Sequence, residues 1–135
     1  MMQSKSFGSV RVYEPDVQAV AGAIDALTEH LSAFREVIAV YLIGSYDRGD
    51  FGPFSDVDVV VIVETSTGRF IDRSEKYLPA RFPVPLDLFV YTRSEVLKMK
   101  ESGHPFWREI ERRHTVLLDR GRQDSPGPHK ARIRT

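Results

Sequence analysis

The 135-residue sequence contains no cysteine, which excludes disulfide bonds and thiolate metal ligands. It has no apolar run close to the roughly 20 residues that a membrane-spanning helix requires, and residues 1–11 lack the apolar centre of a signal peptide. No charge is in excess, because 19 basic residues balance 19 acidic ones, so no overall attraction to nucleic acid or membrane is expected. These absences predict a soluble, cytoplasmic protein whose function depends on local features.

The composition and length are those of one globular domain, with 41% hydrophobic and 28% charged residues. Residues 1–14 form a polar N-terminal extension to which no role is assigned, and residues 15–119 form the domain. Residues 120–135 are rich in Arg, Pro and Gly, which predicts a basic, disordered tail.

The first half of the domain predicts a helix followed by two buried strands. Pro15-Asp16 is a helix start, and the helix is expected to end near Arg35. In segments 37–43 and 57–63, apolar residues occupy both the odd and the even positions, which is typical of strands covered on both faces. The linking segment 44–55 has no helical period and is short for a crossover, so the two strands are predicted to be antiparallel. Apolar residues recur at helical spacing in the first segment: Val17, Val20, Ala21, Ile24, Leu27, Leu31 and Phe34.

Residues 64–91 predict a connection and a third strand. An irregular helix is expected before Pro83, anchored by Phe70, Ile71 and Leu78. Residues 86–91 read as a strand, and about twenty residues separate it from the second strand, enough for a parallel crossover connection. If these strands are adjacent and parallel, Asp87 lies beside the carboxylates at the start of the second strand.

Two helices and a last strand complete the domain. Thr92-Arg93-Ser94-Glu95 is a capping box, which predicts a helix over about residues 93–101. His104-Pro105 opens another helix to about Arg113, with Phe106, Trp107 and Ile110 on its buried face, and Thr115–Leu118 reads as a strand. The predicted fold class is α/β, a small mixed sheet with packed helices.

The segment between the first two strands carries the chemistry. Asp56 and Asp58 project to the same face of a strand, roughly 7 Å apart along the backbone, where two carboxylates repel each other. A divalent cation with a preference for oxygen ligands removes that repulsion. At the other end of the segment, Gly44 permits close approach of the backbone to a phosphate, Ser45 supplies donors and Arg48 a forked, permanent positive charge.

Gly44-Ser45 followed by Ser55-Asp56-Val57-Asp58, with a later Asp87 on an apolar strand, resembles the signature of the DNA polymerase β-like nucleotidyltransferase superfamily. The short chain is similar to the minimal nucleotidyltransferase (MNT) branch, over roughly residues 16–118. The resemblance implies catalysis by the three aspartates, which bind two Mg²⁺ ions, with Mn²⁺ as a substitute, and ATP as the substrate.

By the same resemblance, Gly44 and Ser45 hold the β and γ phosphates. Arg48 is a candidate phosphate ligand, weighed equally against a solvated charge, and Ser55 is another candidate, for which capping of its own turn is the favoured alternative. One departure is Asp47, where the family usually has a small residue. Its charge either weakens nucleotide binding or points away from the nucleotide.

Minimal members of the family are commonly paired with a HEPN-domain toxin, and some transfer AMP to that partner. The expected function is therefore transfer of a nucleoside monophosphate, AMP from ATP, to a hydroxyl of a protein partner. Two alternatives remain open: an antitoxin that neutralises its toxin by contact alone, and transfer to a small molecule such as an aminoglycoside. Nucleic acid and membrane are not expected as partners, and an oligomer is compatible with the sequence.

Overall fold

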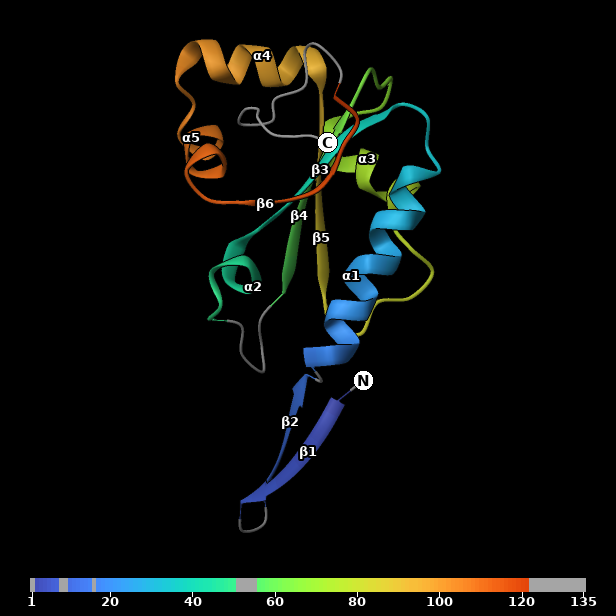
Figure 1. Ribbon diagram of the computed structural model, residues 1–135, viewed down its shortest axis with the longest axis vertical. Coiled ribbons are helices and arrows are strands. Elements are labelled where there is room, and N and C mark those ends of the chain that lie inside the picture. Colours follow the sequence, from blue (N-terminus) through green and yellow to red (C-terminus); the bar gives the residue numbers. More distant parts are fainter. Residues whose placement is uncertain (1, 8–9, 16, 51–55, 122–135) are drawn as a thin grey trace.

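The computed structural model describes residues 2–7, 10–15, 17–50 and 56–121. Within these ranges a four-stranded sheet lies between two layers of helices, as Figure 1 shows. The strand order is β5-β4-β3-β6, formed by β3 (Val37–Ile43), β4 (Val57–Val63), β5 (Leu86–Thr92) and β6 (Thr115–Asp119). The α/β fold with a small mixed sheet is therefore confirmed.

The strand directions follow from the lengths of the connections. β3 and β4 are antiparallel, as are β3 and β6, whereas β4 and β5 are parallel. In the parallel pair Asp58 lies opposite Asp87, so the predicted alignment of these two residues is confirmed. β3 and β4 form the centre of the sheet, and all but Ile43 and Asp58 of their residues are buried.

Helices α1 (Val17–Ser32) and α3 (Phe70–Tyr77) cover one face of the sheet. The apolar stripe of α1 packs on alternate residues of the central strands, and α1 ends slightly before the expected Arg35. The amides of Ala33 and Phe34 donate to carbonyls three residues earlier, which tightens the chain into a turn. The buried residues of this layer are Val20, Ile24, Leu27, Leu31, Val37, Val40, Leu42, Val57, Val59, Val61, Val63, Tyr77, Leu88 and Val90.

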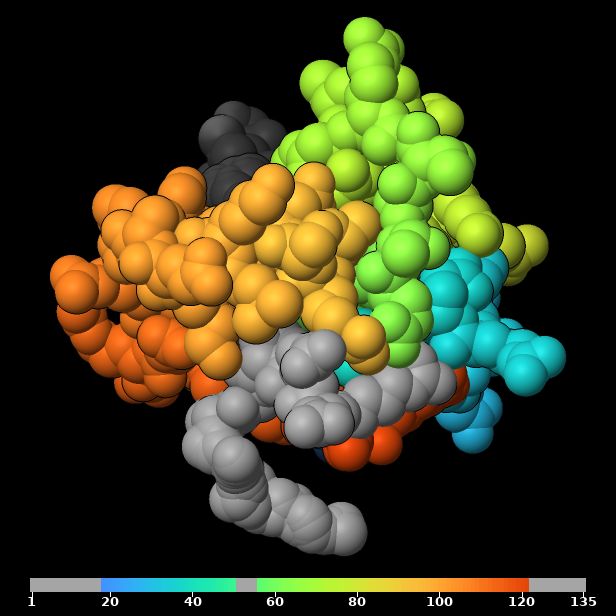
Figure 2. All heavy atoms as spheres, turned by 90° about the horizontal axis from the view of Figure 1, so that it is seen from above, coloured from blue at the N-terminus to red at the C-terminus, as the bar shows by residue number. Residues whose placement is uncertain are grey.

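Helices α4 (Arg93–Ser102) and α5 (Pro105–Arg112) cover the other face. The capping box is present: the Thr92 hydroxyl accepts from the Glu95 amide, and the Glu95 carboxylate accepts from the Thr92 amide. Trp107 and Ile110 are buried, as predicted, and Phe106 is partly buried against them. Figure 2, viewed from above, shows α4 (amber) beside the segment that leads into α3 (green).

The helix expected between residues 64 and 84 is present as α3, but its predicted anchors were wrong. Phe70 is 44%, Ile71 76% and Leu78 42% exposed, whereas Tyr77 is 3% exposed. The Tyr77 hydroxyl donates to Glu36 at 2.8 Å, so this aromatic residue is buried with its polar group paired. Tyr77, rather than the three predicted residues, is the residue of α3 that is buried in the core.

An ion pair joins the two helical layers beside β5. Arg73 of α3 donates two hydrogen bonds to Glu95 of α4, at 2.6 and 3.0 Å, and a third to the Val90 carbonyl at 3.2 Å. The Arg73 side chain is only 9% exposed. Arg73→Ala should therefore lower the free energy of unfolding by about 2 kcal/mol, because it leaves the partly buried Glu95 carboxylate and Val90 carbonyl without their donor.

Urea denaturation measures this change, and Arg69→Ala is the matched control. Arg69 also pairs with a carboxylate of α3, that of Asp72 at 2.9 Å, but its side chain is 81% exposed. The control should cost less than about 0.5 kcal/mol. Equal losses in the two variants would contradict a structural role for the Arg73–Glu95 pair.

The ends of the chain differ from the central sheet. β1 (Met2–Phe7) and β2 (Val10–Pro15) form a separate antiparallel pair over the predicted N-terminal extension. Pro15, which was predicted to open the first helix, is the last residue of β2, and α1 begins at Val17. Arg120, at the predicted start of the tail, donates to the carbonyls of Ser32, Phe34 and Arg35. The remainder of the tail, residues 122–135, lies outside the described residues. In the part of the chain that the structure describes, no helix is long and apolar enough to cross a membrane.

Candidate functional site

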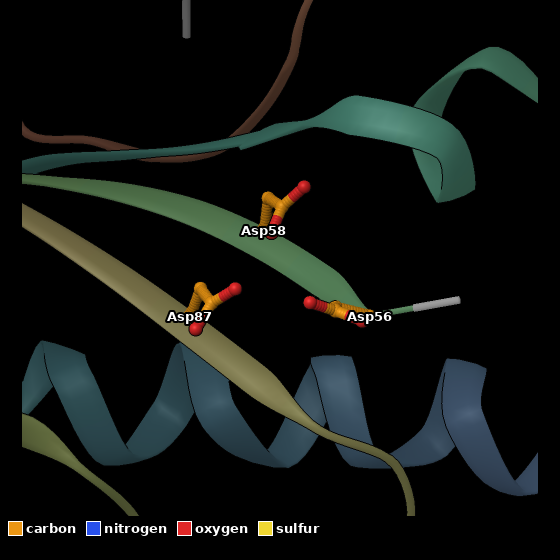
Figure 3. A group of neighbouring side chains, drawn as sticks. All are labelled: Asp56, Asp58 and Asp87. Atoms are coloured by element: carbon orange, nitrogen blue, oxygen red, sulfur yellow. The ribbon is translucent and has the colours of Figure 1, made fainter. Parts of the chain in front are cut away.

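Three carboxylates meet where β4 and β5 begin. Asp56 directly precedes β4, Asp58 is its second residue, and Asp87 is the second residue of β5. Strand alternation directs these side chains to the same face as Val60 and Ile62, the face covered by α4 and α5. One oxygen from each of the three carboxylates lies within 4.8 Å of the other two, and Figure 3 shows the side chains converging. The convergence expected from the sequence is thus present.

The cluster carries unfavourable negative charge without a cation. Burial, together with the charges of Asp87 and Asp56, raises the pKa of Asp58, and the positive charge of Arg48 opposes this effect more weakly. Burial and the neighbouring Asp56 also raise the pKa of Asp87. Carboxylate oxygens that repel each other at this spacing are the donor set that a hard divalent cation prefers. The three residues therefore fit a Mg²⁺ site.

The turn after β3 contains a short helix, α2 (Gly44–Arg48), which corrects the expectation of a non-helical loop. Five residues are too few to show a helical period in the sequence. Gly44 has φ +81°, and a Cβ at this position would lie 2.4 Å from Asp58 Oδ2. Only glycine fits without displacing that carboxylate. The packing of Gly44 against Asp58 thus places the start of α2 directly beside the carboxylate cluster.

Of the other predicted phosphate ligands, Ser45 and Arg48 lie on α2 near Gly44, whereas Ser55 is not described by the structure. Ser45 follows Gly44 in α2, and Arg48, the last residue of α2, lines a cavity together with Gly44 and Asp58. The Arg48 side chain is 52% exposed and lies 3.6 Å from the Asp50 carboxylate. Ser55 lies outside the described residues.

Asp47 points away from the carboxylate cluster. Its carboxylate accepts a hydrogen bond from the Thr115 hydroxyl of β6 and lies 3.8 Å from Arg113 Nε. The Asp47 side chain is only 6% exposed. Of the two roles considered for this charge, the structure favours the one in which it faces away from a bound nucleotide.

A cavity of about 260 Å³ adjoins Asp58 between the sheet and α5. Its lining includes Phe89, which follows Asp87 by two residues and so lies on the same face of β5. The sequence analysis did not identify Phe89, although its spacing of two residues from Asp87 on a predicted strand indicated that it faces the site. Phe106 and Ile110, which were assigned to the core alone, also line this cavity.

Known structures share this fold. A "putative nucleotidyltransferase" from Sulfolobus solfataricus is 18% identical, with a TM-score of 0.50 over 77% of this chain and 86% of the other. A toxin–antitoxin structure with AMP-PNP contains a chain that is 20% identical, with a TM-score of 0.51 over 76% of each chain. At these identities the matches establish the fold alone.

No curated protein matches the sequence significantly. The family model named nucleotidyltransferase domain, in contrast, matches residues 24–116, more than half of the chain. This range contains the Gly44 turn and all three aspartates. The chain therefore belongs to the nucleotidyltransferase domain family of the polymerase β-like superfamily.

Proposed function

We propose that the protein transfers a nucleoside monophosphate, AMP from ATP, to a hydroxyl group of a protein partner, as the antitoxin of a toxin–antitoxin pair. The observation that carries the proposal is the convergence of Asp56, Asp58 and Asp87 within 4.8 Å, beside the Gly44 turn. The arrangement sets acidic metal ligands next to a segment suited to holding phosphate. Nucleotidyl transfer requires both, because charge builds on the phosphate oxygens as the reaction proceeds.

We assign to the three aspartates the binding of Mg²⁺. The bound ion would neutralise charge on the phosphates and favour ionisation of the attacking hydroxyl. Asp58 lies on β4 and Asp56 directly before it, so their spacing is set by the backbone at the start of β4. Asp87 comes from the neighbouring strand and is the most exposed of the three. We assign to Asp87 the side of the site that faces the acceptor hydroxyl.

We assign to Gly44, Ser45 and Arg48 the binding of the triphosphate. Because Gly44 has no side chain, it packs directly against Asp58 and brings the start of α2 beside the carboxylates, where Ser45 adds a hydroxyl donor. Arg48 lines the same cavity as Gly44 and Asp58, which favours phosphate contact over a purely solvated charge. Ser55 remains a proposed ligand on the basis of the sequence pattern alone.

An acceptor on a second protein is supported by two observations. The exposure of Asp87 leaves that side of the cluster accessible to a group carried by another molecule. One structure with the same fold is a toxin–antitoxin structure with AMP-PNP. A HEPN-domain protein is the partner that the resemblance to minimal nucleotidyltransferases implies.

Intact-mass spectrometry tests the proposed transfer. The protein is incubated with Mg²⁺, each nucleoside triphosphate in turn, and the product of the adjacent gene, with the Asp56→Ala/Asp58→Ala variant as the control. The expected result is the added mass of AMP on the partner with ATP, absent with the variant.

Two other results would contradict the proposed transfer and favour a different function. A tight complex without a mass gain, formed equally well by the variant, would indicate an antitoxin that acts by contact alone. If the partner shows no mass gain and forms no complex, a protein acceptor is contradicted, and aminoglycosides would then be tested as acceptors.

Asp47→Ala separates a structural role of Asp47 from repulsion of the nucleotide. Because Asp47 is held by Thr115 and Arg113, we expect the substitution to lower the free energy of unfolding by about 1–3 kcal/mol. The affinity for ATP should stay the same or fall, as α2 loses its attachment to β6. Urea denaturation and calorimetry measure the two effects.

The control for Asp47→Ala is Thr115→Val, which keeps the charge but removes the hydroxyl donor. It should also destabilise the protein. An increase in ATP affinity in Asp47→Ala, without a change in Thr115→Val, would show that the Asp47 charge repels the nucleotide after all.

A further inference from the structure

The cavity beside Asp58 has one apolar wall. Phe89 of β5 and Phe106 of α5 lie with ring centroids 5.6 Å apart, inclined by 56°, and Ile110 of α5 continues this wall. Phe106 is only partly buried, so part of its side chain is accessible. Aromatic surfaces of this kind bind flat, weakly polar rings through stacking and edge contacts.

Most of the remaining lining is polar: Glu109 of α5 and Arg113 contribute charged groups, and the other polar residues belong to the proposed phosphate and metal sites. Gly44, Arg48 and Asp58 all line the same cavity as the aromatic wall. A ligand that fills it therefore has a charged end near Gly44 and a flat, less polar end near Phe106. A nucleoside triphosphate has this division, since its base is joined to the phosphates through the ribose.

The size of the cavity limits what can enter. Its volume of about 260 Å³ is below the roughly 300–1,000 Å³ of typical drug-sized ligand pockets. It therefore fits a part of the nucleotide, such as the base with part of the ribose, while the triphosphate lies at Gly44 and the carboxylates.

We propose that this cavity binds the base of the nucleoside triphosphate, with Phe106 as its main aromatic contact. The inference rests on the proposed function, because it places the base of the same substrate. Phe106 contacts the substrate away from the reacting atoms and therefore contributes to affinity for the base, and not to holding the phosphates.

The acceptor is a less suitable occupant of this cavity. Its lining includes Gly44 and Arg48 from the phosphate side, whereas Asp87, the residue assigned to the acceptor side, is not part of it. Asp87 is exposed and lies on β5, whereas Gly44 follows β3 on the opposite side of β4, so Asp87 offers the acceptor a separate approach. The nucleotide and the acceptor would thus reach the carboxylates from different directions.

Calorimetric titrations with two probes test the base site. Mg²⁺-ATP carries both base and phosphates, whereas Mg²⁺-tripolyphosphate carries the phosphates alone. Phe106→Ala should weaken ATP binding about tenfold, because base stacking is lost. Its affinity for tripolyphosphate should stay within about twofold of the wild type.

The matched control is Phe34→Ala. Phe34 is also partly buried, but it packs against Tyr77 on the opposite face of the sheet. The control should bind both probes like the wild type. If Phe106→Ala does not fold, Phe106→Leu removes the ring while keeping an apolar side chain, and the same comparison applies.

Three results would overturn the inference. Unchanged ATP affinity in the Phe106 variants would place the base elsewhere and leave the proposed function intact. Equal weakening of ATP and tripolyphosphate would show that Phe106 only supports the shape of the site. Failure of the wild-type protein to bind either probe would refute the proposed function itself, and the base site with it.

Discussion

Asp58→Asn is expected to reduce nucleotidyl transfer by roughly 10³-fold or more, while the fold is retained. Asp58 forms the carboxylate cluster with Asp56 and Asp87 and lies beside Gly44. Asparagine keeps the size of the side chain but removes the negative charge that holds a divalent cation. A loss of about 4 kcal/mol of transition-state stabilisation, the scale of a disrupted metal site, corresponds to this factor. Transfer rates at saturating ATP measure it.

The same substitution should stabilise the metal-free protein. Burial and the charges of Asp87 and Asp56 raise the pKa of Asp58 above the 3.8 of a free aspartate. Between that value and the raised one, the folded chain binds more protons than the unfolded chain, so the free energy of unfolding decreases as pH rises. The stability of the metal-free protein should therefore fall as pH rises through this window.

Thermal melting in chelator and in Mg²⁺ measures this effect. At neutral pH, Asp58→Asn should melt at a higher temperature than the wild type in chelator, and Mg²⁺ should stabilise only the wild type. Asp72→Asn is the control, because Asp72 is an exposed aspartate of α3 that pairs with Arg69. Full activity of Asp58→Asn, or equal stabilisation of both proteins by Mg²⁺, would contradict the assignment of Asp58 as a metal ligand.

Gly44→Ala is the second substitution with a large expected effect. A Cβ at residue 44 would lie 2.4 Å from Asp58 Oδ2 and 3.2 Å from its Cγ, so the carboxylate would be displaced. The φ of +81° adds backbone strain of about 1–2 kcal/mol for a residue with a side chain. We expect activity to fall by about 10²-fold or more, because misplacement of a catalytic group by about 1 Å has effects of this size.

Gly49→Ala distinguishes the effect of backbone strain from the effect of displacing the Asp58 carboxylate. Gly49 has φ +85°, similar to that of Gly44, but a Cβ there would meet no atom of the described residues within 4 Å. Both variants should lose stability in urea denaturation, whereas only Gly44→Ala should lose most of its activity. Equal activity in the two variants would show that the contact between Gly44 and Asp58 does not position the carboxylate.

The sheet and the carboxylate cluster could be predicted because their signals are strong and local. Val57–Val63 is a nearly continuous apolar run, and the connection of about twenty residues to the next strand is long enough for a parallel pair. Once β4 and β5 are parallel, the register that sets Asp87 opposite Asp58 follows from their similar starting points. The capping box at Thr92 likewise depends only on neighbouring residues.

Features that depend on tertiary packing could not be predicted in this way. α2 is shorter than two turns, so no period identifies it. The attachment of α3 through Tyr77 requires Glu36, which is distant in the sequence. The cavity lined by Phe89 and Phe106 exists because α5 packs over β5, and the orientation of Asp47 depends on Thr115 of β6.

Calorimetric titration of ATP, with Mg²⁺ and then with chelator, tests most directly whether the carboxylate cluster and the Gly44 turn form one metal-dependent nucleotide site. The wild-type protein should bind ATP in Mg²⁺ and lose most of that affinity in chelator, because the carboxylates and the phosphates repel each other without a cation. Asp56→Ala/Asp58→Ala should bind poorly even in Mg²⁺. Binding of ATP to the wild type that is undiminished by chelator would contradict the proposed site.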